Sequence, residues 1–104
     1  MADYAHGKIS YEYINQGNKL SEEALKRISP QDTIRYWSTA ALYAMKMGEN
    51  NLAIQRFNRV LETSHITEHQ KAIAYSSLAF IYQNMGDTVL ANRNIILAAI
   101  ADIK

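Results

Sequence analysis

The chain has no cysteine among its 104 residues, so disulfide bonds, thiolate metal sites and cysteine nucleophiles are all excluded. Its N-terminus lacks the apolar segment of a signal peptide, and no run approaches the roughly 20 apolar residues of a membrane span. We therefore expect a soluble chain, cytoplasmic by default. Lack of cysteine leaves the compartment open, and a periplasmic location fits if the chain was cut from a longer protein.

An excess of charge of one sign is also lacking. Eleven Lys and Arg residues are balanced by ten Asp and Glu residues, and the net charge is +1. Lys26 and Arg27 form the only adjacent basic pair, so the chain has no polybasic run for nucleic acid. The hydrophobic fraction of 48% suits one small domain with a single core. We expect neither nucleic acid nor a membrane as a partner.

No segment alternates apolar and polar residues over strand length, and no Asn-Gly or Asp-Gly hairpin turn occurs. Apolar residues recur at helical spacing instead, between a single proline and four glycines. The pattern predicts an all-α fold of about six helices, arranged as antiparallel hairpins in a short solenoid. The expected helices span residues 3–16, 21–28, 30–47, 51–63, 68–85 and 88–103.

Residues with capping preferences mark the expected helix ends. Ser29 before Pro30 suits an N-cap followed by proline at the first helical position. Thr67 with Gln70 three residues later has the form of a capping box. The other marks are glycines that close helices and polar residues that cap the next ones: Gly17, Gly48, Gly86, Asn50 and Asp87.

Two short stretches are nearly identical, MGENNLA from Met47 and MGDTVLA from Met85, at an offset of 38 residues. The same offset pairs Trp37 with Tyr75, Ser38 with Ser76 and Ala41 with Ala79. A motif with fixed spacing and variable polar residues indicates a structural unit used twice. The unit is a helical hairpin, and two such hairpins stack because neither can bury its apolar face alone.

The repeated residues resemble the tetratricopeptide repeat. The matching positions are Trp37, Ala41, Gly48, Ala53 and Phe57 in one copy, and Tyr75, Leu78, Ala79, Tyr82, Gly86, Ala91 and Ala98 in the other. The chain departs from the pattern at Ala44, Val60 and His65, and by four extra residues near HITEHQK. A looser similarity, in LAAIADIK and LAFIYQNMGD, is to helical-repeat regions of large bacterial sensor-regulator proteins.

The resemblance implies one domain over residues 1–104. Residues 34–67 form the first clear repeat, and residues 72–104 form the second. Residues 1–30 resemble a degenerate leading hairpin, in which Tyr13 and Gly17 fit but Ala24 comes two residues late and Pro30 arrives early.

Residues that could support chemistry have simpler structural interpretations. His65 and His69 are four apart, but the capping box places His65 before its helix, and the spacing indicates no third ligand. Glu22 and Glu23 are adjacent, so they point in different directions on a helix and suit its N-terminus. We expect no catalytic, metal-binding or cofactor-binding residue and no cofactor, and we expect that the protein is not an enzyme.

Two surfaces are predicted to bind protein. The resemblance implies a concave peptide groove lined by the first helix of each repeat: Tyr11, Arg35, Ser38, Leu42, Met45, Lys46, Ile73, Ser76, Phe80, Gln83 and Asn84. Family members that bind a C-terminal carboxylate resemble one another in having lysine and asparagine at fixed positions of the first helix. Ser38 and Leu42 occupy those positions here, so binding of that type is not expected. The alternative is a shallow groove that binds nothing by itself.

The second surface is the last helix. Its residues Val89, Ile96, Leu97, Ile100 and Ile103 replace the polar Asn51, Asn58, Arg59, Glu62 and His65 of the first repeat. A terminal repeat should instead present a polar outer face to water. Three candidates would cover this helix: a further helix missing from the chain, a second copy in a homodimer, or a different protein partner.

The sequence therefore predicts a protein–protein interaction module, a scaffold or adaptor that binds a peptide or helix. The alternative is a regulatory or sensory segment cut from a larger bacterial signalling or transcription-regulator protein.

Overall fold

The structure is a computed structural model that describes residues 29–103. These residues form four helices: α4 Pro30–Lys46, α5 Asn50–Glu62, α6 Glu68–Asn84 and α7 Thr88–Ile103. The all-α class is confirmed, and each helix lies within one residue of its expected span. The predicted total of about six helices is not matched. The expected helices 3–16 and 21–28, with Tyr11 and Gly17, lie outside the described residues.

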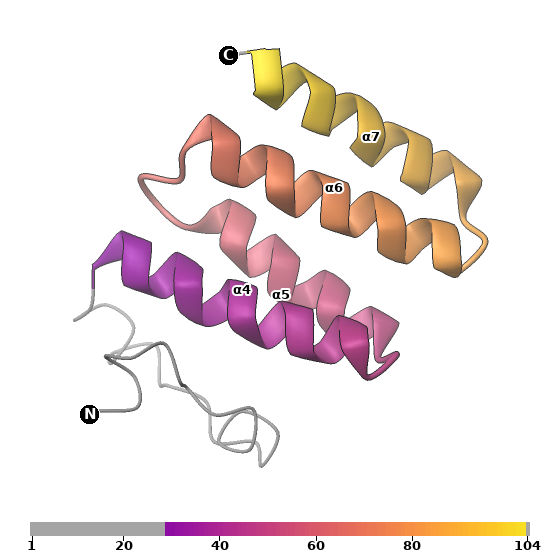
Figure 1. Ribbon diagram of the computed structural model, residues 1–104, viewed down its shortest axis with the longest axis horizontal. Helices are drawn as coiled ribbons and strands as arrows, with labels where there is room; N and C mark the ends of the chain where they lie inside the picture. The colour runs from indigo at the N-terminus through magenta and orange to yellow at the C-terminus, as the bar shows by residue number, and fades with distance from the viewer. Residues whose placement is uncertain (1–28, 104) are drawn as a thin grey trace.

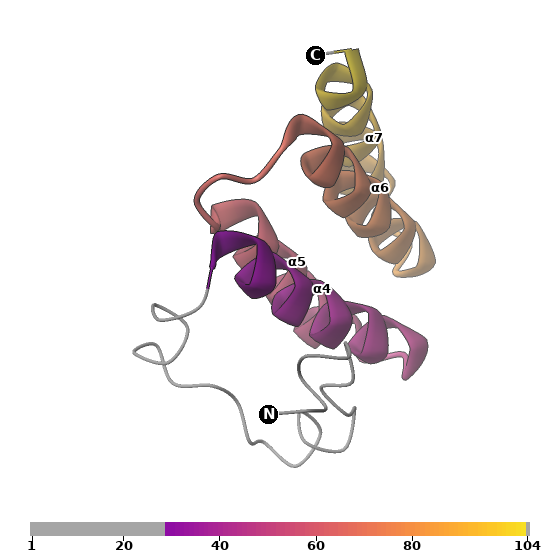
Figure 2. The same cartoon turned by 60° about the vertical axis from the view of Figure 1, so that its left-hand side comes forward.

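The helices form two antiparallel hairpins that stack side by side (Figure 1). α4 packs on α5 and α6 packs on α7, while α5 and α6 contact each other and join the hairpins. Turning the molecule keeps the same order, with α6 between α5 and α7 (Figure 2). α7 therefore stands at one end of the stack, with contact to α6 on one side.

Local signals in the sequence set the helix ends. The Ser29 hydroxyl accepts a hydrogen bond from the Asp32 amide at 3.1 Å, and Pro30 begins the helix. At α6 both halves of the capping box between Thr67 and Gln70 are present. The Asp87 carboxylate accepts from the Leu90 amide at 3.0 Å and caps α7. Three of these expected caps are therefore confirmed.

The turn after α4 differs from the expectation in one respect. Gly48 and Gly86 have φ angles of 76° and 83°, as predicted for glycines that end a helix in the left-handed conformation. Asn50, however, does not cap α5. It is the first residue of that helix, and the N-cap is Glu49, whose side chain makes no capping hydrogen bond.

Small residues let the helices approach closely. Ala41, Ala53, Ala79 and Ala91 are buried, in agreement with their places in the repeat pattern. Side chains from α4, α5 and α6 share one core cluster: Ile34, Ala41, Ala44, Ala53, Phe57, Val60, Ala74, Leu78 and Ile81. This cluster fixes α6 against the first hairpin.

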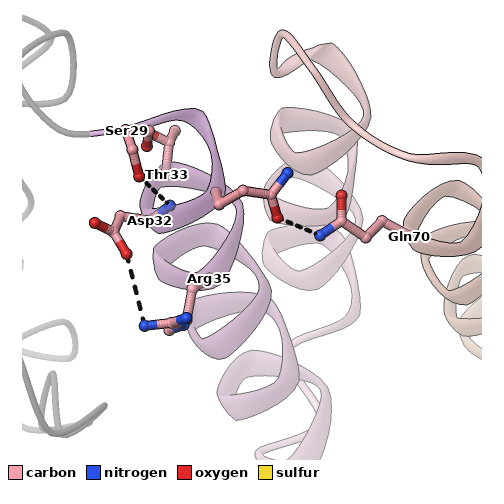
Figure 3. A network of polar contacts seen from close by, with 6 residues as sticks. Ser29, Asp32, Thr33, Arg35 and Gln70 are labelled. Atoms are coloured by element: carbon pink, nitrogen blue, oxygen red, sulfur yellow. Dashed lines mark hydrogen bonds and ion pairs between the residues drawn. The ribbon is translucent and has the colours of Figure 1, made fainter.

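A polar contact also links the starts of α4 and α6. The Gln70 side-chain amide donates to the Gln31 side-chain oxygen at 2.6 Å (Figure 3). The Gln31 amide in turn donates to the His65 carbonyl at 3.3 Å. Since Gln70 also belongs to the capping box, the start of α6 is held by its own cap and by α4 together.

Candidate protein-interaction surfaces

The described residues predicted for the peptide groove lie on α4 and α6, and this set is here called the predicted row. Most of its described members are exposed: Arg35, Leu42, Lys46, Ile73, Ser76, Phe80, Gln83 and Asn84. Ser38 is half-buried, and Met45 is half-buried and packs against the core cluster. Met45 therefore contributes to the fold as well as to this face.

The cation at one end of this row has a local partner. Arg35 lies 3.6 Å from the Asp32 carboxylate, one turn before it on α4 (Figure 3). Both side chains are well exposed, so the pair contributes little to stability. The guanidinium remains accessible to a ligand that offers a better acceptor.

A hollow beside this row lies between α6 and α7. Its volume is about 380 Å³, and its lining comes from both helices: Ser76, Ala79, Phe80, Gln83, Ile95, Ala98, Ala99 and Asp102. Three predicted groove residues, Ser76, Phe80 and Gln83, belong to it. The structure thus brings part of the predicted groove together with α7, which the sequence assigned to a separate surface.

The outer face of α7 is exposed in the single chain and mostly apolar, with Asn92 and Arg93 as polar residues between Val89 and Ile96. Val89, Ile96, Ile100 and Ile103, here called the α7 stripe, are 78, 59, 46 and 85% exposed. Val89, Ile96 and Ile103 are spaced by seven residues, or two helical turns, so they lie on one side of the helix. The opposite side is buried and consists of Ala91, Asn94, Ala98 and Ala101.

One residue predicted for this outer face lies elsewhere. Leu97 is half-buried, so it lies at the edge of the exposed face and is not part of the α7 stripe. The equivalent residue of α5 is Arg59, whose guanidinium lies over the Trp37 ring of α4 at 4.9 Å from the centroid. Arg59 looked like an outward polar position in the sequence, and the cation–π contact explains why it is not.

Five residues that line the hollow were not predicted for a site. Ala79 and Ala98 were named only as positions of the repeat pattern, and Ile95, Ala99 and Asp102 were not singled out at all. The repeat offset contains a signal for Ile95 and Ala99. Ile95 and Ala99 are the equivalents of Phe57 and Leu61, which are a buried residue of the core cluster and a half-buried residue packed against it. Where large buried residues of the first hairpin have smaller or more exposed equivalents in the second, the second hairpin has a contact site that no described helix fills.

The two histidines considered as metal ligands lie in different elements. His65 lies in the linker before α6, with a φ of 63°, and His69 is exposed in the first turn of α6. Within residues 29–103, no three His, Asp or Glu side chains lie close enough together to hold a metal ion. None of the four described helices is both long and apolar enough to cross a membrane.

Residues 1–104 match the family model described as "SusR N-terminal TPR domain", in agreement with the tetratricopeptide resemblance of the sequence. Comparisons with curated proteins and with solved structures give no significant match. Domains built from such repeats are in general scaffolds for protein–protein contacts and are not enzymes.

Proposed function

The chain belongs to the family of SusR N-terminal TPR domains, and we propose that it is a protein-interaction module that self-associates through the α7 stripe. The observation that carries this proposal is the exchange of polar for apolar residues between equivalent helices. Asn58 and Glu62 are exposed on α5, and their equivalents on α7 are Ile96 and Ile100.

The stack itself argues against a further repeat helix as the cover. α6 already packs beside α5, yet Asn51, Asn58 and Glu62 remain exposed. A helix that followed α7 in the same geometry would leave the equivalent residues of the α7 stripe exposed as well. Whatever buries the α7 stripe must therefore approach from a direction other than the one in which the helices stack.

A second copy fits this surface. The members of the α7 stripe carry no charge, and Arg93, which lies on the same face between Val89 and Ile96, is exposed and long enough to keep its guanidinium in water beside the contact of two copies. Together the four side chains expose nearly as much surface to water as three fully exposed aliphatic side chains would. Burying them in both copies would contribute about 8–16 kcal/mol. Because this is comparable to the roughly 4–15 kcal/mol that association costs, we expect a dimer that depends on concentration.

The test is the absolute mass of the chain, measured by light scattering behind a sizing column over a range of concentrations. We expect a dimer that dissociates on dilution and that Ile96→Glu with Ile100→Lys converts to a monomer. Asn58→Glu with Glu62→Lys introduces the same residues at the equivalent positions of α5, and this control should retain the dimer. A wild-type chain that stays monomeric at millimolar concentration would refute self-association.

A second function is favoured by the description of the family, which names an N-terminal domain. We propose as the alternative that the module is a regulatory or sensory segment of a larger bacterial signalling or transcription-regulator protein. In that case the α7 stripe would transmit the state of the repeats to an attached domain. The same two stripe substitutions in the longer protein should then alter its output, whereas the α5 control should not.

A further inference from the structure

We infer that Ile96 lies on the twofold axis of the dimer and packs against Ile96 of the second copy. This inference rests on the self-association proposed above and goes further, because it identifies the residue at the centre of the contact and makes that residue decide which chains can pair. It follows from the spacing and exposure of the apolar residues of α7, together with the symmetry of a contact between identical chains.

Three members of the α7 stripe form one line along the exposed side of the helix. Val89, Ile96 and Ile103 are seven residues apart, which is close to two helical turns, so successive members of the line differ in direction by only about 20°. All three side chains are more than half exposed. The buried residues of α7 lie on the opposite side of the helix, so the line points directly away from the rest of the chain.

The exposed residues beside this line suit the rim of a contact. Ile100 and Arg93 lie on one side of it, about 40° and 60° from Ile96, and Asn92 and Ala99 lie at similar angles on the other side. Arg93 is long enough to cover apolar surface with its stem while its guanidinium stays in water. Polar residues are therefore confined to the rim, as is usual in interfaces, and the line itself is apolar and uncharged.

An antiparallel contact of two α7 helices requires an axis at the middle of the line. A residue on such an axis contacts its own equivalent, and residues at equal distances before and after it contact each other. Val89 and Ile103 each lie about 10 Å along the helix from Ile96, so an axis at Ile96 places Val89 of each copy on Ile103 of the other. Displacing the axis by one turn or more carries one end of the line past the partner helix and leaves it exposed in both copies.

A parallel contact gives the same result for Ile96. The twofold axis then runs along the pair of helices, and every residue of the line contacts its own equivalent. Ile96 is therefore opposite Ile96 in both arrangements, and only the ends of the line distinguish them. Because any side chain placed at this position would face a copy of itself, Ile96 determines whether a second copy is accepted.

Site-directed cross-linking tests the self-contact. The chain has no cysteine, so one introduced thiol can form a disulfide only with its equivalent in a second copy. Ile96→Cys is oxidised with glutathione disulfide, and the covalent dimer is followed by mass spectrometry. Cα atoms within about 7 Å of each other can be bridged, so we expect the covalent dimer to form at least about tenfold faster than with Ile95→Cys.

Ile95→Cys is the matched control. The Ile95 side chain is 51% exposed and that of Ile96 is 59% exposed, so the two thiols are similarly accessible in the single chain. Ile95 points about 100° away from Ile96 on α7, however, and its thiol would lie outside the contact. Light scattering of both variants in their reduced form establishes that each is still a dimer at the concentration used.

A pair of charge variants tests the same contact without a disulfide. In Ile96→Lys and in Ile96→Glu, two like charges would face each other at the axis, and each variant alone should be monomeric. An equal mixture places opposite charges there and should dimerise at least about tenfold more tightly than either variant alone. A mixture that dimerises no better than its components would contradict the self-contact.

The position of the axis and the self-association can fail separately. A reduced Ile96→Cys chain that is dimeric by light scattering, yet cross-links no faster than Ile95→Cys, would overturn the axis at Ile96 and leave self-association standing. A wild-type chain that is monomeric at millimolar concentration would refute self-association, and this inference with it.

Discussion

Phe57 on α5 and Ile95 on α7 occupy equivalent positions of the two hairpins, yet Phe57 is 2% exposed and Ile95 is 51% exposed. The two residues differ in what lies next to them rather than in their place within a hairpin. α6 packs beside α5, and no described helix packs on the corresponding side of α7. Apolar residues at one repeat position thus serve the core in one hairpin and remain available for binding in the other.

This difference predicts unequal costs of truncation. Phe57→Ala removes a buried aromatic ring and should lower the free energy of unfolding by about 3–5 kcal/mol. Ile95→Ala should lower it by less than about 1 kcal/mol, because half of the side chain is already in water. Chemical unfolding followed by the fluorescence of Trp37, the one tryptophan, measures both. Equal losses at the two positions would mean that the hollow is filled in the isolated chain.

The glycines between paired helices give a second prediction. Gly86 has a φ of 83° and Gly48 a φ of 76°, and no other group lies within 4 Å of a Cβ built at either position. An alanine would therefore meet no steric clash beyond its own backbone. We expect Gly86→Ala and Gly48→Ala each to destabilise the domain by about 1–2 kcal/mol, the cost of the left-handed conformation for an L-residue.

The matched control for these glycines is asparagine, which tolerates the left-handed region better than alanine does. Gly86→Asn should recover part of the loss seen with Gly86→Ala in the same unfolding experiment. An alanine variant as stable as the wild type would show that the turn relaxes into another conformation.

The capping box at α6 gives a third prediction. Thr67 accepts from the Gln70 amide, and the Gln70 side chain accepts from the Thr67 amide. Thr67→Ala should cost about 0.5–2 kcal/mol, because it leaves the amide of Gln70 without its partner at the helix start. Thr67→Ser keeps the hydroxyl and should stay near the wild type. If serine and alanine cost the same, the methyl group of Thr67, and not its hydrogen bond, would account for the effect.

The sequence predicted the fold far better than it predicted the candidate sites. Helix ends depend on neighbouring residues, such as Ser29 with Pro30 and Thr67 with Gln70, so a local pattern was enough to place them within one residue. The α7 stripe could also be recognised, since polar residues at its equivalents in α5 mark an outward face. The first 28 residues, with Tyr11, lie outside the described part of the chain, so their predicted hairpin stays a prediction.

The repeat offset pairs Ile95 and Ala99 with Phe57 and Leu61, but whether such positions are covered or open depends on which helices have a neighbour, so the sequence alone did not reveal the hollow. Leu97 illustrates the same limit. Its equivalent, Arg59, is charged and yet turns inward over Trp37, and the type of residue alone did not reveal that direction. Burial is a property of the assembled stack, whereas residue type is a property of one position.

The last prediction compares two equivalent polar residues, Arg56 on α5 and Asn94 on α7. Arg56 donates to the Ala40 carbonyl of α4 at 2.9 Å and so connects the two helices of its hairpin. Asn94 is buried but donates to the Leu90 carbonyl of its own helix at 2.9 Å. Removing the Arg56 side chain therefore breaks a hydrogen bond between two helices. Removing the Asn94 side chain breaks none between helices, and the Leu90 carbonyl keeps its backbone hydrogen bond within α7.

Arg56→Met retains most of the apolar stem and should lower the free energy of unfolding by about 1.5–3 kcal/mol, the range for a hydrogen bond from a charged group. Asn94→Ala should cost less than about 1 kcal/mol, since the better helix propensity of alanine offsets the lost bond. Gln55→Met, at the exposed neighbour of Arg56, controls for the introduced methionine and should have little effect. If Asn94→Ala proves as costly as Arg56→Met, Asn94 must hold α7 to α6, and the packing of the second hairpin depends on that polar contact.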